Sequence, residues 1–488
     1  MPNLQLLGNV KPAHLGLALM IAASALGLLY VLAVKPIYNL LLHPLPQVPG
    51  PQALGRQPPA LHLQYGADIV RVAPDELSFL RPDAWREVMG YIPRGVPENE
   101  KDPLIFRGLN VEDSVIGAPR DRHRVMRAML SHGFSASRML DQQPIIMRYI
   151  DLLVERLREK AVVDRGIPLN MVLWYNYATF DIIGDLAFGE AFGCLESAAL
   201  HPWVAVVFSW IKLNARVVQY RRTVPWLGDL IDSVLGRMAT EQVKEHMGYA
   251  RLRRLDAAHR QGRPVPDAQP ARGEREPVHR RGLRDHGVDP VVRVVPAAHP
   301  PDKMQKVTDE LFATFARDDE INFNSVQSLK YMIAMFEEAL RIFPPVPVTV
   351  PRVTPPGGRQ ICGDHIPENT KLGIWHYSMY HHPGNFALPE EFHPERWLGE
   401  DPRFAHDRKE AFEPFSHGSR NCLGKNLAYA EMRTIMARML FNFDMRLADG
   451  YERWADGIQI HNLFEKSPLF IHLTPRGDHE RAHLRSKH

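Results

Sequence analysis

One short segment gathers the residue types needed to hold a flat cofactor beside a sulfur atom. It runs from Phe415 to Gly424 (F-S-H-G-S-R-N-C-L-G), and the stretch behind it, from Asn426 to Met439, has helical periodicity. A thiolate just before a helix is stabilised by the positive end of the helix dipole and by nearby backbone amides. A lone cysteine is more often an inert buried residue. Cys422, however, stands in a pattern of phenylalanine, two glycines and arginine that is far from random.

Other residues of this segment suit the same chemistry. Gly418 and Gly424 allow tight turns and a close approach of the backbone to a flat cofactor, and Arg420 supplies a cation for a carboxylate. The segment resembles the haem-binding loop of the cytochrome P-450 family. That resemblance implies haem (heme, iron protoporphyrin IX) as the cofactor. It also implies Cys422 as the iron ligand, Phe415 as a shield for the sulfur and Arg420 as a partner of a haem propionate. Thiolate ligation of haem iron favours cleavage of the O–O bond.

A second motif is the pair Glu338 and Arg341, whose spacing of three places both side chains on one helical face. Taken alone, such a pair is an ordinary surface ion pair of about 0–1 kcal/mol. It is followed by F-P-P-V-P at 343–347 and by P-E-R-W at 394–397. These segments resemble the family's Glu-x-x-Arg helix and its downstream Pro-Glu-Arg segment. The resemblance implies a buried triad of Glu338, Arg341 and Arg396 that supports the haem-binding core.

Three basic residues are further candidates for contact with the haem propionates. His123 and Arg127 resemble a family helix in which an aromatic residue or histidine, and an arginine four positions later, reach the propionates. Arg352, which follows Pro351, resembles another propionate-binding position. The alternative for each of the three is a solvated basic side chain.

The elements that must position these residues are mainly helical. Apolar residues at spacings of three and four predict helices within 120–247, including Asn176 to Phe192, and again at Val307 to Phe315 and Val326 to Phe343. A β-hairpin is expected at Ile69 to Leu80, with short strands at Val346 to Val350 and Lys371 to Trp375. The fold class is therefore mostly α with small β-sheets, in keeping with the cytochrome P-450 fold.

The N-terminal part predicts a membrane anchor. Residues 15–34 form an uncharged run of 20 residues, long enough for one transmembrane helix, and longer than the apolar region of a cleaved signal peptide, which is the alternative. The expected organisation is a membrane anchor at 1–43, a proline-rich hinge at 44–60, a haem-binding catalytic domain at 61–475 and a charged tail at 476–488. Only three cysteines occur, which indicates a reducing compartment. These features predict a single-pass membrane protein whose body faces the cytosol, and the resemblance to microsomal members of the family implies the endoplasmic reticulum membrane.

The segment 261–301 does not fit the rest of the chain. It contains eight prolines and seven arginines, but no lysine, serine, threonine or aromatic residue. This composition predicts a disordered or poorly packed loop, either a natural linker or an out-of-frame or mis-spliced stretch. The family places its central haem-crossing helix here, with an acid and an alcohol that supply protons for the reaction with dioxygen. That helix is missing, so no catalytic residue for proton delivery is assigned.

The resemblance implies a monooxygenase that inserts one oxygen atom of O2 into an apolar small molecule. Its expected partners are a membrane-bound NADPH-dependent reductase and a hydrophobic substrate. The mixed charges, with a net charge of +3, give no footprint for nucleic acid. The stretches 70–79 and 181–189 resemble filamentous-fungal members that often act on terpenoid or polyketide intermediates of secondary metabolism. The alternatives are a haem-binding pseudoenzyme or mis-predicted gene product that lacks the oxygen-activating helix, and a thiolate-haem isomerase or dehydratase.

Overall fold

The computed structural model describes four main stretches of the chain. They are residues 58–106, 114–202, 301–452 and 467–486, with short pieces at 217–218, 221, 230–231, 454, 460–461 and 463–464. The expected membrane span at 15–34, hinge residues 44–57 and segment 261–300 lie outside the described residues. Within the part that is described, no helix combines the length and the apolar character needed to cross a membrane.

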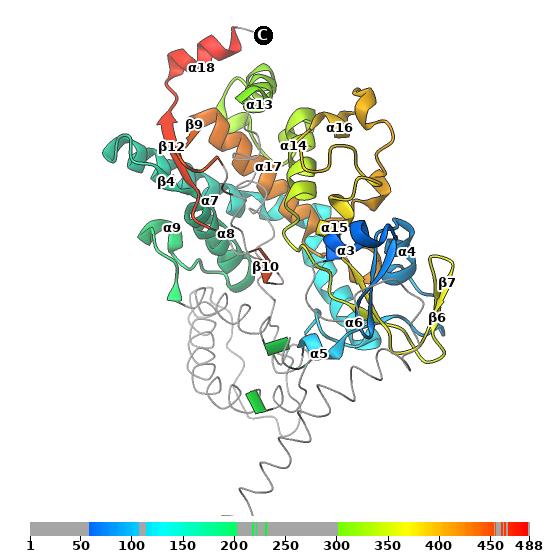
Figure 1. The fold of residues 1–488 in the computed structure, drawn as a ribbon. Helices are drawn as coiled ribbons and strands as arrows, with labels where there is room; N and C mark the ends of the chain where they lie inside the picture. The colour runs from blue at the N-terminus through cyan, green and yellow to red at the C-terminus, as the bar shows by residue number, and fades with distance from the viewer. Residues whose placement is uncertain are drawn as a thin grey trace, which may run out of the picture.

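Helices dominate the described chain, as the periodicity predicts (Figure 1). The first half contains α3 (Pro58–Tyr65), α4 (Asp83–Met89), α5 (Pro103–Phe106), α6 (Arg120–Ser131), α7 (Ala136–Val163), α8 (Met171–Phe188) and α9 (Cys194–Ser197). The second half contains α13 (Pro301–Thr314), α14 (Lys330–Ile342), α15 (His376–Tyr380), α16 (Glu395–Leu398), α17 (Lys425–Asn442) and α18 (Asp478–Arg485). The helices expected at 176–192, 307–315, 326–343 and 426–439 correspond to α8, α13, α14 and α17, so these predictions are confirmed within a few residues of their ends.

The strands form small sheets. The mixed sheet has the order β1-β2-β8-β5-β3, made from β1 (Ile69–Ala73), β2 (Glu76–Phe79), β8 (Lys371–Ile374), β5 (Arg352–Val353) and β3 (Glu100–Lys101). A second sheet has the order β4 (Leu169–Asn170), β12 (Phe470–Pro475), β9 (Phe443–Leu447). The described residues also form two short hairpins: β6 (Arg359–Ile361) with β7 (Asp364–Ile366), and β10 (Ile460–His461) with β11 (Leu463–Phe464).

The predicted hairpin is confirmed, because β1 and β2 pair in antiparallel register from Ile69↔Phe79 onward. The predicted strand at Lys371 to Trp375 is also confirmed, as β8. The strand predicted at Val346 to Val350 is wrong: these residues form an irregular segment, and the next strand, β5, begins only at Arg352. Prolines interrupt and bound that stretch, and a proline cannot donate to a β-ladder.

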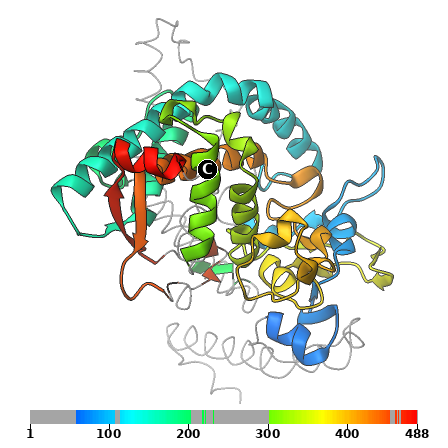
Figure 2. The same ribbon diagram turned by 90° about the horizontal axis from the view of Figure 1, so that it is seen from above.

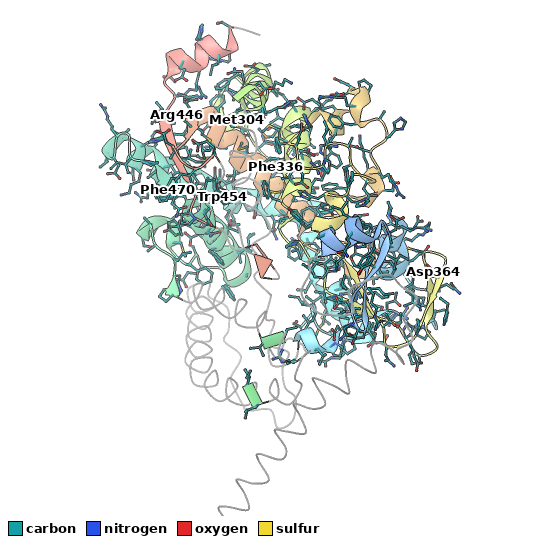
Figure 3. All side chains as sticks on the ribbon, in the orientation of Figure 1. Met304, Phe336, Asp364, Arg446, Trp454 and Phe470 are labelled. Atoms are coloured by element: carbon teal, nitrogen blue, oxygen red, sulfur yellow. The ribbon has the colours of Figure 1, made fainter. Side chains whose placement is uncertain are left out.

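Among the described residues, two hydrophobic clusters make up the core, and the candidate site lies where they meet. A helical cluster is built mainly from α7, α8, α13, α14 and α17, which the view from above shows side by side (Figure 2). The second cluster joins β2, α4, β8 and α15. Figure 3 shows Phe336 of α14 within the helical part and Asp364 of β7 at the far edge of the β-rich part. Phe412 packs against both clusters, so the segment that leads into Cys422 starts at their junction.

Candidate haem-thiolate site

The segment around Cys422 is a tight loop that ends at the start of α17. The backbone N–H of Cys422 donates to the carbonyl oxygen of Phe415 at 2.8 Å, which closes the loop on itself. Phe415 is buried, and its ring lies 5.1 Å from that of Tyr429 on α17. Helix α17 begins at Lys425, three residues after Cys422. The loop therefore presents the sulfur at the amino end of a helix, where a thiolate is favoured.

The other two cysteines have surroundings that disfavour a thiolate. Cys194 and Cys362 are buried, whereas Cys422 is only partly buried. Burial raises the pKa of Cys194 to about 11 and that of Cys362 to about 12. Both therefore remain protonated at neutral pH, as expected for inert structural cysteines. Cys422 is the cysteine whose position suits ligation.

The two glycines of the loop have different surroundings. Gly418 has a φ of +78°, and a Cβ atom there would collide with the carbonyl oxygen of Met89 at the end of α4. Gly424 has an ordinary φ of −86°. In the described part of the chain, the nearest atom to a Cβ at 424 would be a ring carbon of Phe134, 3.9 Å away. The fold thus requires glycine at 418, whereas a Cβ atom at 424 would fit, with open space around it in the described part of the chain.

A cluster of basic side chains lies next to this loop. His123 is buried, and its pKa is lowered to about 3 by burial and then by Arg420, Lys101, Arg127 and Arg352. The structure therefore brings together the four basic residues predicted from the sequence, although they come from three separate regions of the chain. Lys101, on β3, joins them. It is a single lysine between two acidic residues, and nothing in the local sequence marks it for this role.

The basic cluster is hydrogen-bonded and shielded from solvent, with His123 and Arg352 buried and Lys101 and Arg127 partly buried. Burial and the neighbouring Arg420 lower the pKa of Arg352 to about 10, so it remains charged at neutral pH. Arg127 donates to the backbone oxygen of Asn421 at 2.7 Å and to its side-chain oxygen. Arg420 donates to Glu98 at 2.7 Å and to the carbonyl oxygen of Ala118 at 2.8 Å. A buried cation is costly unless an anion or hydrogen-bond acceptors accompany it, so the cluster suits a ligand that carries negative charge.

The second group of predicted residues also meets in the fold. Arg341 binds Glu338 through two parallel hydrogen bonds of 2.9 Å, and Arg396 donates to the same carboxylate at 3.0 Å. All three side chains are fully buried. The indole N–H of Trp397 and the backbone N–H of His393 donate to Glu338 as well, each at 2.9 Å. The carboxylate therefore receives five hydrogen bonds. The two guanidinium groups outweigh the effect of burial, so the pKa of Glu338 is lowered.

Asp407 completes this group and was not predicted from the sequence. Its carboxylate pairs with Arg396 and accepts the backbone N–H of Ala387 at 2.7 Å. Two arginines and two carboxylates then balance in charge. Arg341 further donates to three carbonyl oxygens, those of Tyr380, Pro389 and Glu391. The group thereby ties α14 to the irregular segment that runs from α15 toward the Cys422 loop.

Comparison with known proteins decides the family. The cytochrome P450 family model matches residues 81–254 and 297–459. Cytochrome P450 monooxygenase tpeC of Talaromyces stipitatus is 38% identical over 91% of this chain and 92% of its own length. Trichothecene C-15 hydroxylase of Fusarium sporotrichioides is 35% identical over 94% of this chain and 98% of its own length. Averantin hydroxylase of Dothistroma septosporum is 36% identical over 94% of this chain and 92% of its own length. The chain belongs to the cytochrome P450 family.

Cytochromes P450 are oxidoreductases that bind haem through a cysteine thiolate, and the residues of this chain fit that cofactor. Haem is flat and carries two carboxylates. The loop offers a partly buried sulfur, the open space beside Gly424 and an adjoining buried cluster of cations. The family match is interrupted at residues 255–296, a gap that overlaps the segment of unusual composition at 261–301.

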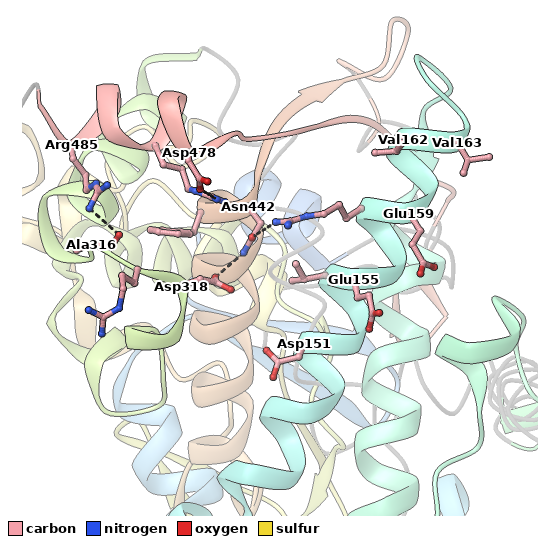
Figure 4. A pocket seen from close by; sticks show the side chains of 15 residues that line it. Asp151, Glu155, Glu159, Val162, Val163, Ala316, Asp318, Asn442, Asp478 and Arg485 are labelled. Carbon is pink, nitrogen blue, oxygen red and sulfur yellow. Dashed lines mark hydrogen bonds and ion pairs between the residues drawn. The ribbon is translucent and has the colours of Figure 1, made fainter.

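A cleft of about 1010 Å³ lies away from this site, between α7, the end of α17 and α18 (Figure 4). Nine of its fifteen lining residues are charged, and none belongs to the predicted site. Arg158 and Asn442 join across it at 2.6 Å, and Asn442 in turn donates to Asp318 at 2.8 Å. Pockets for apolar small molecules are lined mainly by hydrophobic and aromatic groups. This cleft is therefore no candidate for the substrate pocket.

Proposed function

We propose that this cytochrome P450 is a haem-thiolate monooxygenase in which Cys422 would bind the haem iron. The observation that carries the proposal is the position of Cys422: partly buried, before α17, in a loop bordered by a buried cluster of cations. When bound, haem supplies the activation of dioxygen, and its thiolate ligand favours cleavage of the O–O bond. One oxygen atom enters an apolar substrate, and the other leaves as water.

Different residues of the chain would hold different parts of the cofactor. Phe415, buried against Tyr429, would keep water away from the sulfur. Arg127, Arg352 and Arg420 would hold the haem carboxylates through charge-assisted hydrogen bonds. His123, neutral at physiological pH, would act as a hydrogen-bond donor or acceptor rather than as a cation.

The group of Glu338, Arg341 and Arg396 would act as a structural support. It lies outside the basic cluster, and its charges are satisfied internally together with Asp407. Its many bonds to backbone atoms fix the segment before the Cys422 loop. Its contribution to the reaction is therefore to hold the loop in place.

The substrate class proposed is an apolar fungal secondary metabolite, a terpenoid or polyketide. The supporting evidence is that similar proteins are named for hydroxylating trichothecene and averantin. We further propose that electrons come singly from an NADPH-dependent reductase. The anchor at 1–43 would place the body on the cytosolic face of the endoplasmic reticulum membrane.

A second candidate function is haem binding without turnover, as in a pseudoenzyme or the product of a mis-predicted gene. The observation that favours it is the segment 261–301, which has no serine or threonine and overlaps the interruption of the family match. Reading the genomic DNA across this segment tests it. A Gly-x-Asp/Glu-Thr helix encoded in another frame would show that the natural protein contains the oxygen-activating helix.

The deciding experiment compares the reduced, carbon-monoxide-bound absorption spectrum of three proteins. The wild-type chain is expected to show the thiolate-ligated haem band, and Cys422→Ala to lose it. Cys362→Ala is the matched control and is expected to keep the band, because that thiol is buried and protonated. A band retained in Cys422→Ala refutes the ligand assignment. Substrate-dependent NADPH consumption with a reductase then separates a monooxygenase from a haem protein without turnover.

A further inference from the structure

A carboxylate lies within the basic cluster itself. Glu98 accepts two hydrogen bonds from Arg420 on one oxygen, from Nη2 at 2.7 Å and from Nε at 3.2 Å. Its second oxygen lies 3.7 Å from Nε of Arg120. The side chains of Glu98 and Arg420 are only 11% and 3% exposed, so this ion pair is largely shielded from solvent.

Arg420 has few donors left after these contacts. A guanidinium group carries five N–H donors. Two of them point at Glu98, and a third is given to the carbonyl oxygen of Ala118 at 2.8 Å. Two donors therefore have no acceptor within the described part of the chain and could meet a further carboxylate. Glu98 also acts on Arg352, whose cationic form it stabilises.

We infer that Glu98 is an internal competitor of the haem carboxylates for Arg420, and that it sets how tightly the chain holds its cofactor. The inference rests on the proposed haem site. Without haem, Glu98 supplies the negative charge that the buried arginines need. With haem bound, a propionate and Glu98 share one guanidinium group, and two like charges lie close together. Removing the charge of Glu98 relieves this repulsion and weakens the competition for the donors of Arg420.

The test is the rate of haem loss from the full-length holoprotein to excess apomyoglobin, followed by absorbance. Glu98→Gln keeps the size of the side chain and an oxygen acceptor but removes the charge. We expect it to slow haem loss about tenfold, the ratio that corresponds to about 1.4 kcal/mol. Glu100→Gln is the matched control, because it removes the same charge from an exposed side chain two residues away. It is expected to release haem at the wild-type rate.

Two further measurements show whether the effect runs through the haem carboxylates. Reconstitution with haem dimethyl ester, which has no free carboxylates, is expected to abolish the difference between Glu98→Gln and the wild type. Slowing of equal size with the ester overturns the inference, as does unchanged or faster loss of ordinary haem. Glu98→Ala serves if the glutamine variant does not accumulate, with the same expected direction. Faster haem loss from Glu98→Ala would show that Glu98 only holds Arg420 in position.

The result is distinguishable from a failure of the proposed function. A wild-type chain without the thiolate band refutes the haem-thiolate assignment. A wild-type chain with that band, whose Glu98→Gln variant loses haem at the wild-type rate, refutes only the competition between carboxylates.

Discussion

Replacement of Glu338 by glutamine is the sharpest test of the buried ion group. The substitution keeps the shape of the side chain but removes the charge that two guanidinium groups share. Arg341 would lose its paired charge-assisted bonds, and Arg396 would keep only Asp407 as a counterion. Removing one partner of a buried pair leaves an uncompensated charge and costs about 3–5 kcal/mol. Since a folded domain is stable by about 5–15 kcal/mol, Glu338→Gln is expected to remove a large part of the total.

The assay is urea unfolding of the haem-loaded protein, followed by far-ultraviolet circular dichroism and by loss of the haem absorbance. Glu159→Gln is the matched control, because Glu159 also pairs with an arginine three residues away, Arg156, at 2.9 Å. The side chains of Arg156 and Glu159 are 36% and 53% exposed, whereas those of Glu338 and Arg341 are fully buried. The control substitution is expected to lower the free energy of unfolding by about 0–1 kcal/mol.

Equal losses in the free energy of unfolding for Glu338→Gln and Glu159→Gln would refute the reasoning. They would mean that burial does not amplify the loss of this charge. The wild-type protein must also keep haem up to a higher urea concentration than Glu338→Gln. If Glu338→Gln unfolds at lower urea but releases haem only together with unfolding, the group stabilises the fold as a whole rather than the loop alone.

Two further predictions follow from particular contacts. Gly418→Ala is expected to prevent haem incorporation, because its φ of +78° and the carbonyl oxygen of Met89 leave no room for a Cβ atom; normal haem content in purified Gly418→Ala would contradict this. Glu395 is partly buried, which raises its pKa, but hydrogen bonds from Lys303 and Lys306 outweigh burial and lower the pKa from 4.5 to about 2. A carboxylate with a lowered folded-state pKa stabilises the fold above its unfolded-state pKa and loses this effect as the pH falls. Thermal stability of the wild type should therefore drop more between about pH 5 and pH 2 than that of Glu395→Gln, and parallel curves would contradict it.

The local sequence was sufficient for the elements whose pattern is repeated along the chain. Helices α14 and α17 were predicted because apolar residues recur at spacings of three and four over several turns. The β1–β2 hairpin was predicted because alternation flanks a Pro-Asp turn. The prediction of a strand at 346–350 was wrong because three valines and a threonine favour a strand, while the prolines among and beside them remove amide donors from a ladder.

The partners of the predicted side chains could not be predicted from the local sequence, because they come from distant parts of the chain. Glu98 and Arg420 are 322 residues apart, and Asp407 lies in an irregular segment with no periodic pattern. Only the packing of α16 and of the segment after it places Asp407 against Arg396. Family resemblance supplied His123, Arg127 and Arg352, since each is unremarkable among its own neighbours. Glu98 and Lys101 were found from the structure alone.

The balance of charge distinguishes the two buried ionic groups and assigns them different tasks. In the group around Glu338, two arginines face two carboxylates, and other donors meet backbone carbonyl oxygens, so the charges balance among the described residues. Around His123, the cations Lys101, Arg127, Arg352 and Arg420 are near enough to suppress its protonation, and Glu98 pairs with only one edge of Arg420. Buried charge that is satisfied within the protein stabilises a fold, whereas an excess of one sign favours a ligand of the other. The same argument predicts opposite effects of removing a carboxylate: Glu338→Gln weakens the protein, while Glu98→Gln strengthens its hold on the cofactor.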